Sequence, residues 1–476
     1  MKAIGKSLIQ TWASFGPRFM PFADVATPDL PLGRLLRLSL FQISVGMLTV
    51  LMIGTLNRVM IVELKVSATV VAIMVALPIL FAPLRALVGF RSDTYRSAIG
   101  WRRVPFVWFG AMLQFGGLAM MPFALLVMSG DGEAPAWVGQ IGAGLAFVLA
   151  GAGMQISQTA GLALATDLAE ERSRPRVVAL MYVMLLVGMV ASGFVFGFLL
   201  RDFSPLRLIQ VVQGAAVVAL LLNAVALWKQ EPRRPKRLAR DSGIAAFRAT
   251  FSAFLARPGV KRFLVALALG TAGFNMQDIV LEPYGGEVLG MTVAQTTALT
   301  ALLAGGALLA FALAARALAR GFDAFRLAGY GLLVGLPAFA LVILAAPLES
   351  ALVFCAGTVL IGLGGGLFAV ATLTAAMGLE TGDDAGLALG AWGAVQATAA
   401  GLAMALGGGA RDLFGALAAS GALGEALSGA ASGYGSVYLV ELVLIVAALA
   451  AIGPLAKHAR AETSGDNRFG MVELPG

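Results

Sequence analysis

The chain has 476 residues, of which 59% are hydrophobic and 13% are charged, and its mean hydropathy is +0.88. Because a water-soluble domain carries about 25% charged residues, this composition excludes an ordinary soluble protein. The formal net charge of +8 is explained below by membrane topology, so it does not call for a nucleic-acid partner.

Residues 1–34 are expected to be a cytoplasmic segment at the membrane interface and not a signal peptide. No continuous apolar core follows Lys2 and Lys6. Apolar residues recur instead at spacings of three and four from Ile4 to Phe19, which is typical of a helix lying in the interface.

Apolar runs then predict about twelve transmembrane helices, since lipid admits only helices or closed barrels and the runs lack the alternation of barrel strands. The predicted spans are 36–62, 67–88, 104–128, 136–165, 177–200, 206–228, 262–283, 292–318, 326–346, 350–379, 385–410 and 433–455. We expect two six-helix halves, 35–228 and 262–456, with a basic cytoplasmic linker at 229–261 and a cytoplasmic tail at 457–476. This layout favours an all-α integral membrane protein with the major facilitator superfamily fold.

The distribution of Lys and Arg predicts that both chain ends are cytoplasmic. Of 34 basic residues, all but five fall on the side of the chain ends. The five assigned to the other side are Arg58, Lys65, Arg201, Arg207 and Arg411. The acidic connection at 380–384, on the cytoplasmic side, is a candidate contact surface.

The connection after the second span resembles the facilitator motif Gly-x-x-x-Asp-Arg-x-Gly-Arg-Arg, with extra residues between its parts. It predicts a latch on the cytoplasmic side, in which an aspartate caps a helix and pairs with arginines. The latch residues are Arg85, Gly89, Asp93, Arg102 and Arg103. The alternative for Arg85 is that its side chain extends to the interface.

Polar side chains inside spans are costly, so they are candidates for binding a pigment or a partner. Asn57 and Arg58 end the first span, with Glu63 and Lys65 just beyond. The simpler alternative for this group is an arginine reaching the interface together with an ion pair.

Two further groups follow. Gln155 and Gln158 share a helical face and either line a central cavity or bond to a neighbouring helix. The seventh span carries the best candidates, which are Asn275, Gln277, Asp278 and Glu282. Asp278 and Glu282 lie one turn apart, and two carboxylates on one face suit a cation, a proton or a basic partner. The alternative is a turn at the end of the span, broken by Pro283 and Gly285.

The residues present give little support for a disulfide, a metal site, a catalytic site or a phosphate-binding loop. The single cysteine, Cys355, forms no internal disulfide, and the single histidine, His458, follows the last apolar run, so no metal site is expected. No catalytic constellation is found, and we expect no enzymatic activity. The glycine-rich stretches 362–366 and 407–409 lack a phosphate-binding motif and predict close helix packing, with a flat pigment or a partner helix as the alternative.

Five segments together resemble the PucC/LhaA family of purple phototrophic bacteria. They are residues 22–31, 54–64, 82–93, 155–167 and 276–286, the last reading Met-Gln-Asp-Ile-Val-Leu-Glu-Pro-Tyr-Gly-Gly. The resemblance extends from about residue 20 to 455. It implies a facilitator-fold assembly factor for light-harvesting antenna, with the core LH1 antenna favoured over peripheral LH2.

The resemblance implies bacteriochlorophyll, bound or delivered, as the guest and the α and β antenna polypeptides as partners in the lipid bilayer. It also implies contact with the reaction centre, bacteriochlorophyll synthase and protein-insertion machinery, at the bacterial inner or intracytoplasmic membrane. Without a histidine in the spans, pigment magnesium would need a Gln, Asn, carbonyl or water ligand. The alternative function is a secondary transporter of a small solute or pigment precursor, with Asp278 and Glu282 as coupling groups.

Overall fold

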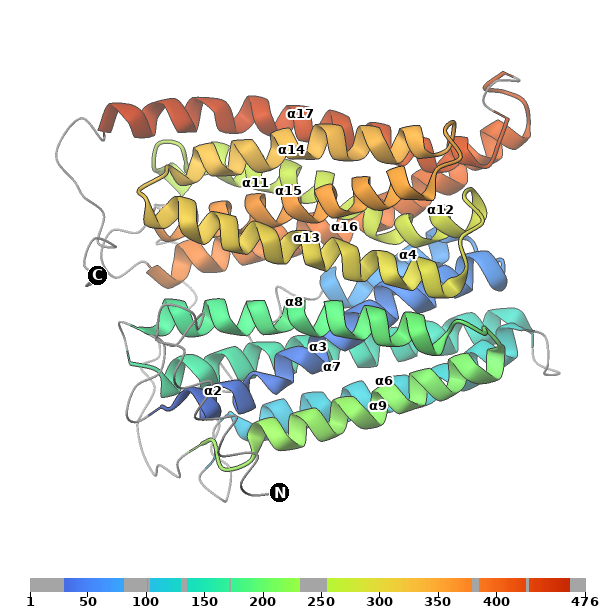
Figure 1. Ribbon diagram of the computed structural model, residues 1–476, viewed down its shortest axis with the longest axis horizontal. Helices are drawn as coiled ribbons and strands as arrows, with labels where there is room; N and C mark the ends of the chain where they lie inside the picture. Colours follow the sequence, from blue (N-terminus) through green and yellow to red (C-terminus); the bar gives the residue numbers. More distant parts are fainter. Residues whose placement is uncertain are drawn as a thin grey trace.

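The computed structural model describes residues 30–80, 101, 103–129, 135–170, 173–231, 255–378, 385–424 and 428–462. Throughout these ranges the regular structure is helical, as Figure 1 shows. The predicted latch residues Arg85, Gly89, Asp93 and Arg102 lie outside the described residues, as does the connection at 380–384.

The first part of the chain forms six helical passes. The first pass runs from Leu32 to Glu63 and contains α2 (Leu32–Leu38), α3 (Leu40–Thr49) and two π-helical stretches, η2 (Val50–Leu56) and η3 (Val59–Glu63). The next five are α4 (Ala68–Leu80), α6 (Val104–Met128), α7 (Ala136–Leu168), α8 (Arg174–Leu199) and α9 (Pro205–Leu227).

The second part forms six more passes, and its first is interrupted. This pass consists of α11 (Val260–Asn275), a short 3-10 turn η6 (Met276–Ile279) and α12 (Leu281–Glu287). The remaining five are α13 (Val293–Ala319), α14 (Ala324–Ala345), α15 (Ala351–Gly378), α16 (Ala385–Ala419) and α17 (Ala431–Glu462).

A helix is therefore present at each of the twelve predicted spans within the described residues. Within the described residues, ten helical passes are long and apolar enough to cross a membrane. The two passes outside this set are α4, which is described only as far as Leu80, and α16. The prediction of an all-α, multi-pass membrane protein is confirmed. The boundaries proposed for the two halves, the linker and the two end segments stay predictions.

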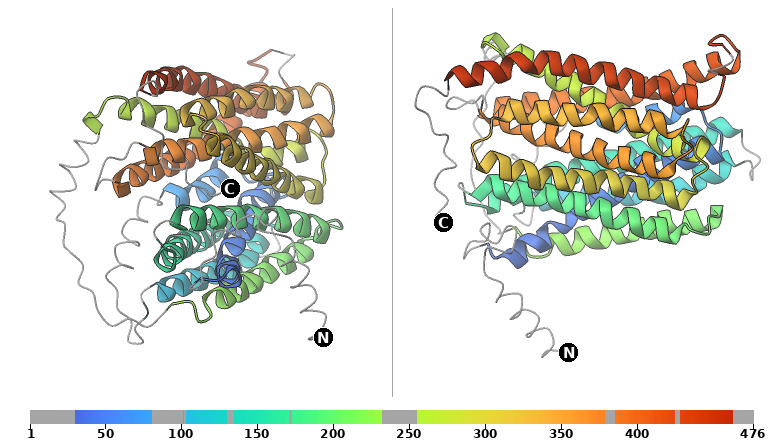
Figure 2. Two further views of the ribbon diagram at one scale, coloured as in Figure 1. Left: turned by 60° about the vertical axis from the view of Figure 1, so that its left-hand side comes forward. Right: turned by 45° about the horizontal axis from the view of Figure 1, so that its top comes forward.

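The helices pack into two groups that Figures 1 and 2 show one above the other. Within the groups, α6 packs on α7 and α9, and α14 packs on α15 and α17. Between them, α8 packs along α13 and α4 packs along α16. The first pass and the interrupted pass also contact each other, because η2 touches η6 and η3 touches α12.

Glycines allow some of these helices to approach very closely. A Cβ on Gly408 of α16 would collide with the backbone carbonyl of Ala68 on α4, and one on Gly362 of α15 with that of Leu303 on α13. Close packing is thus confirmed at these two positions, and the alternative of a pigment lying against them is wrong. Gly409, in contrast, has open space where its side chain would be.

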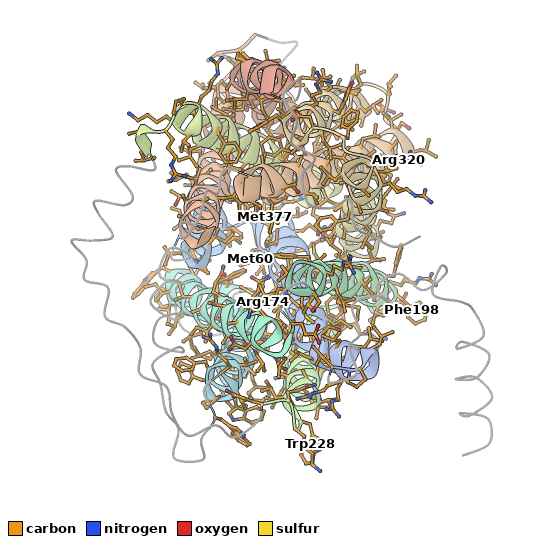
Figure 3. The ribbon with its side chains drawn as sticks, turned by 90° about the vertical axis from the view of Figure 1, so that its left-hand side faces the viewer. Met60, Arg174, Phe198, Trp228, Arg320 and Met377 are labelled. Carbon is orange, nitrogen blue, oxygen red and sulfur yellow. The ribbon has the colours of Figure 1, made fainter. Side chains whose placement is uncertain are left out.

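Basic residues lie at both ends of the bundle. Arg174 and Arg320 lie at the end that faces the viewer in Figure 3, together with Trp228. At the opposite end the helical passes meet around Lys65 and Arg411, and we call this the joined end. The chain alternates between the ends, so the start of α2 and the end of α17 lie at the same end, as Figure 1 shows.

Candidate functional site

The break in the seventh pass is the centre of the candidate site. The Asn275 side chain donates to the carbonyl of Thr271 at 2.7 Å, and the helix then tightens into η6. Pro283 lies within the first turn of α12, where a proline without an N–H is tolerated. The alternative of a turn at Pro283 and Gly285 is therefore wrong, because the break precedes Pro283 and the helix continues to Glu287.

A small cavity of about 60 Å³ lies beside this break. It is lined by residues of the first pass, α8, the interrupted pass and α13. Its lining residues are Thr49, Ile53, Gly54, Met189, Asp278, Leu281, Glu282, Thr300 and Leu303. Both carboxylates predicted for the seventh span thus reach the same cavity.

Glu282 is the most deeply buried acid of this cavity, with 2% of its surface exposed. One carboxylate oxygen, Oε1, accepts a hydrogen bond from the hydroxyl of Thr300. The other, Oε2, is buried without a hydrogen-bond partner. Glu282 can lie this close to the first pass because Gly54 has no side chain, and a Cβ there would collide with its carboxylate.

Asp278 is half-buried and its Oδ1 accepts a hydrogen bond from the side chain of Gln277. The backbone N–H of Gln277 donates in turn to Oε1 of Glu441 on α17. Glu441 is fully buried, and its second oxygen has no hydrogen-bond partner. Glu441 was not among the predicted site residues, although a lone acid within the apolar run 433–455 is a signal for one.

Asn57 ties the first pass to the break. Its fully buried side chain donates to the backbone carbonyl of Ile279 at 3.0 Å and to that of Asp278 at 3.4 Å. Carbonyls freed where a helix is interrupted need new donors, and Asn57 supplies one from another pass.

Arg58 lies next to this contact and does not reach the interface. It forms the expected ion pair with Glu63 at 2.6 Å and also donates to the carbonyl of Met291 at 3.3 Å. Its side chain is only 5% exposed, so the alternative of an arginine extending to the headgroups is wrong. Two acceptors within the protein hold the guanidinium inside.

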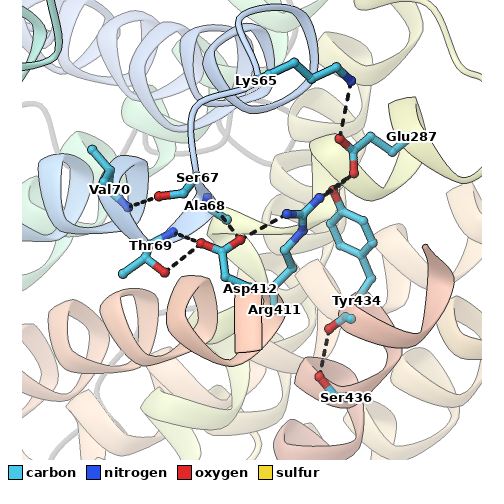
Figure 4. Close-up of polar contacts among 11 residues, drawn as sticks. Lys65, Ser67, Ala68, Thr69, Val70, Glu287, Arg411, Asp412, Tyr434 and Ser436 are labelled. Atoms are coloured by element: carbon cyan, nitrogen blue, oxygen red, sulfur yellow. Dashed lines mark hydrogen bonds and ion pairs between the residues drawn. The ribbon is translucent and has the colours of Figure 1, made fainter. Parts of the chain in front are cut away.

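A polar network closes the joined end, as Figure 4 shows. Glu287 pairs with Arg411, accepts a hydrogen bond from Tyr434 at 2.7 Å, and lies 3.9 Å from the ammonium of Lys65. Asp412 pairs with Arg411 at 3.0 Å. The network connects the loop after the first pass with α12, α16 and α17.

Asp412 also caps a helix of the other group. Its carboxylate accepts from the backbone N–H groups of Ala68 at 3.2 Å and Thr69 at 2.8 Å, and from the Thr69 hydroxyl at 2.7 Å. A negative charge at the start of α4 also suits the helix dipole. Asp412 was not among the predicted site residues, because nothing local in the sequence connects residue 412 with residue 68.

Gln155 and Gln158 do not line the cavity beside Glu282. Both are half-buried on α7, and Oε1 of Gln155 is buried without a hydrogen-bond partner. In this region Gln114 of α6 donates to the Ser157 hydroxyl of α7 at 3.0 Å. The site therefore contains Asn57, Gln277, Asp278 and Glu282 but not the glutamines of α7.

Arg103, the described member of the predicted latch, lies at the end opposite to the joined end. Its guanidinium pairs with Asp167 of α7 at 3.0 Å. Its backbone N–H donates to the carboxylate of Glu231, which also accepts from the N–H of Val104 at 3.0 Å. This arginine therefore connects helices at that end, while the latch with Asp93 stays a prediction.

The arrangement of the described helical passes is that of a multi-pass, all-helical membrane protein with a transporter-like fold. The chain superposes on a bacterial homologue of the human lysosomal transporter Spinster, crystallised in an inward-facing and unoccupied conformation, with a TM-score of 0.67 and 17% identity. The match covers 89% of this chain and 96% of the other, and at this identity it shows the fold alone.

The family follows from sequence similarity. Residues 55–460 match the family described as PUCC protein. A Rhodobacter capsulatus protein described as uncharacterized, in the puhA-bchM intergenic region, is 52% identical over 98% of both chains. Protein PucC of Rhodovulum sulfidophilum is 54% identical over 87% of this chain and 92% of its own. The chain therefore belongs to the PUCC protein family.

Proposed function

We propose that this protein is an assembly factor for light-harvesting antenna, without catalytic activity of its own. The observation that carries the proposal is its membership of the PUCC protein family, with about 50% identity to relatives named PucC. The proposed clients are the LH1 α and β polypeptides, with LH2 as the alternative, and the guest is bacteriochlorophyll. The proposed location is the inner or intracytoplasmic membrane, with both chain ends in the cytoplasm.

The size of the buried cavity bears on where a guest would bind. Pockets that enclose drug-sized ligands measure about 300–1,000 Å³. The cavity beside Glu282 measures about 60 Å³, too little for a tetrapyrrole. We therefore place pigment and antenna helices on the lipid-facing surface, where large apolar side chains such as Phe109, Phe123 and Trp137 are more than half exposed.

The test is purification of the tagged full-length protein from pigmented cells in mild detergent. The proposal expects bacteriochlorophyll in the absorption spectrum and antenna polypeptides in the peptide mass analysis. The same analysis would identify reaction-centre, bacteriochlorophyll synthase or insertion-machinery subunits. A colourless preparation free of antenna polypeptides would contradict the proposal.

Absorption spectra of a deletion strain separate the two antenna clients. Loss of the LH1 band with LH2 retained supports LH1 as the client, and the reverse result supports LH2. Complementation with the intact chain must restore the lost band. An unchanged spectrum would count against both clients.

A second function, secondary transport by alternating access, is favoured by one observation. Transporters bind their coupling ions at interrupted helices, and the interrupted seventh pass here carries two acids that reach a cavity. Asp278→Asn should then abolish accumulation of a solute in membrane vesicles, whereas Asp323→Asn, at the start of α14, should not. Antenna loss on deletion without any change in solute uptake would exclude transport.

A further inference from the structure

The cavity beside the seventh pass contains a buried carboxylate oxygen that no described residue contacts by a hydrogen bond. Glu282 is 98% buried, and its Oε2 has no hydrogen-bond partner. Asp278 reaches the same space, with Gln277 as its hydrogen-bonding partner. The guanidinium of Arg58 lies against Gly286, but its ion pair is with Glu63.

We infer that this cavity binds a monovalent cation of about the size of sodium. The inference does not depend on the proposed function. A buried carboxylate oxygen without a hydrogen-bond partner is costly, and a small cation among oxygen atoms reduces that cost. The site would lie between the two helix groups, at the interrupted pass.

The residues that line the cavity supply oxygen atoms that suit such an ion. The carboxylates of Glu282 and Asp278 and the hydroxyls of Thr300 and Thr49 are hard oxygen donors. The Thr49 hydroxyl donates its proton to the carbonyl of Val45 at 2.9 Å, which leaves oxygen lone pairs for a cation. Among the described residues no group of three or more His, Cys, Asp or Glu could hold a metal ion, which disfavours a divalent metal.

The volume also fits. A cavity of about 60 Å³ is large enough for a small ion together with water. Apolar side chains of Ile53, Met189 and Leu303 complete the walls. A bulky organic cation is excluded by this size.

The position of the site gives binding a structural consequence. Thr49 belongs to the first helix group, whereas Asp278, Glu282 and Thr300 belong to the second. A cation that both groups contact stabilises the arrangement in which they meet, because a ligand favours the state that contains its site.

The experiment compares thermal unfolding of the purified full-length protein in NaCl, KCl and choline chloride at equal ionic strength and fixed pH. Sodium should raise the unfolding midpoint by about 3 °C over choline, and the rise should saturate. Glu282→Gln should remove this difference. Glu349→Gln, an exposed acid in the turn before α15, should keep it.

Thr49→Val provides a second variant that keeps the charge and removes one oxygen ligand, in case Glu282→Gln does not fold. It should shift the sodium dependence to higher concentrations. Equal midpoints in the three salts would overturn the inference, and so would a sodium effect that persists in Glu282→Gln. A stability that responds to pH but not to sodium would show that a proton occupies the site, and would equally overturn it.

Discussion

Asn57 in the first pass and Ile279 in the seventh are joined by a hydrogen bond of 3.0 Å from a side-chain amide to a backbone carbonyl. The two residues are 222 positions apart in the chain. The bond satisfies backbone that the interruption of the seventh pass would otherwise leave without a donor.

Asn57→Asp should therefore destabilise the protein by about 1–3 kcal/mol, because it keeps the shape of the side chain but removes the donor from a buried carbonyl. The measurement is the thermal unfolding midpoint in detergent. Asn275→Asp is the matched control, since the Asn275 amide bonds within its own helix and is half-buried. We expect a smaller loss there, and equal losses would contradict the role given to Asn57.

Asp412→Asn should lower stability by about 1–2 kcal/mol, because Asp412 caps α4 and pairs with Arg411. Asp323→Asn is the control, because it makes the same substitution at an ordinary helix cap. Asp323 accepts only from the N–H of Arg326 at 2.8 Å, at the start of its own helix. Asn caps about as well as Asp, so that variant should lose a few tenths of a kcal/mol. Equal losses of stability in the two variants would show that the ion pair of Asp412 with Arg411 contributes nothing beyond an ordinary helix cap.

Gly408→Leu should prevent proper packing of α16 on α4, because there is no space for a side chain against the Ala68 carbonyl. Gly409→Leu is the neighbouring control and should be tolerated, since its side chain would enter open space. The measurement is the yield of monodisperse protein on size-exclusion chromatography. A normal yield for Gly408→Leu would mean that these helices are further apart than described.

Two substitutions at Glu441 should separate its hydrogen bond from its charge. Glu441→Gln retains an acceptor for the N–H of Gln277 and should fold with nearly normal stability. Glu441→Leu leaves that buried N–H without its acceptor and should cost about 1–3 kcal/mol. The unfolding midpoints of the two variants provide the test. If the Leu variant matched the Gln variant, the bond between α17 and the interrupted pass would have no energetic weight.

The helices could be predicted from the sequence because a lipid-spanning helix needs about 20 apolar residues, whatever its neighbours are. The span predicted at 104–128 matches α6, Val104–Met128. The location of Arg58 could not be predicted in this way. Its burial depends on the carbonyl of Met291, which is 233 positions away in the chain.

The candidate site was predicted in part, for the same reason. Asp278 and Glu282 were found because two acids in an apolar span are unusual at any position. Their joint cavity depends on Gly54 and Thr300, which belong to other passes and carry no local signal. Gln155 and Gln158 showed an equally clear polar pattern, but the packing of α7 keeps them away from that cavity.

The cap that Asp412 provides for α4 has a consequence for biosynthesis. The second pass leaves the ribosome long before residue 412 has been translated. Its first amide groups must therefore enter the membrane without their final partner. Folding of the first helix group is therefore completed only when α16 supplies the carboxylate of Asp412. A chain truncated before α16 would leave the first N–H groups of α4 without this acceptor.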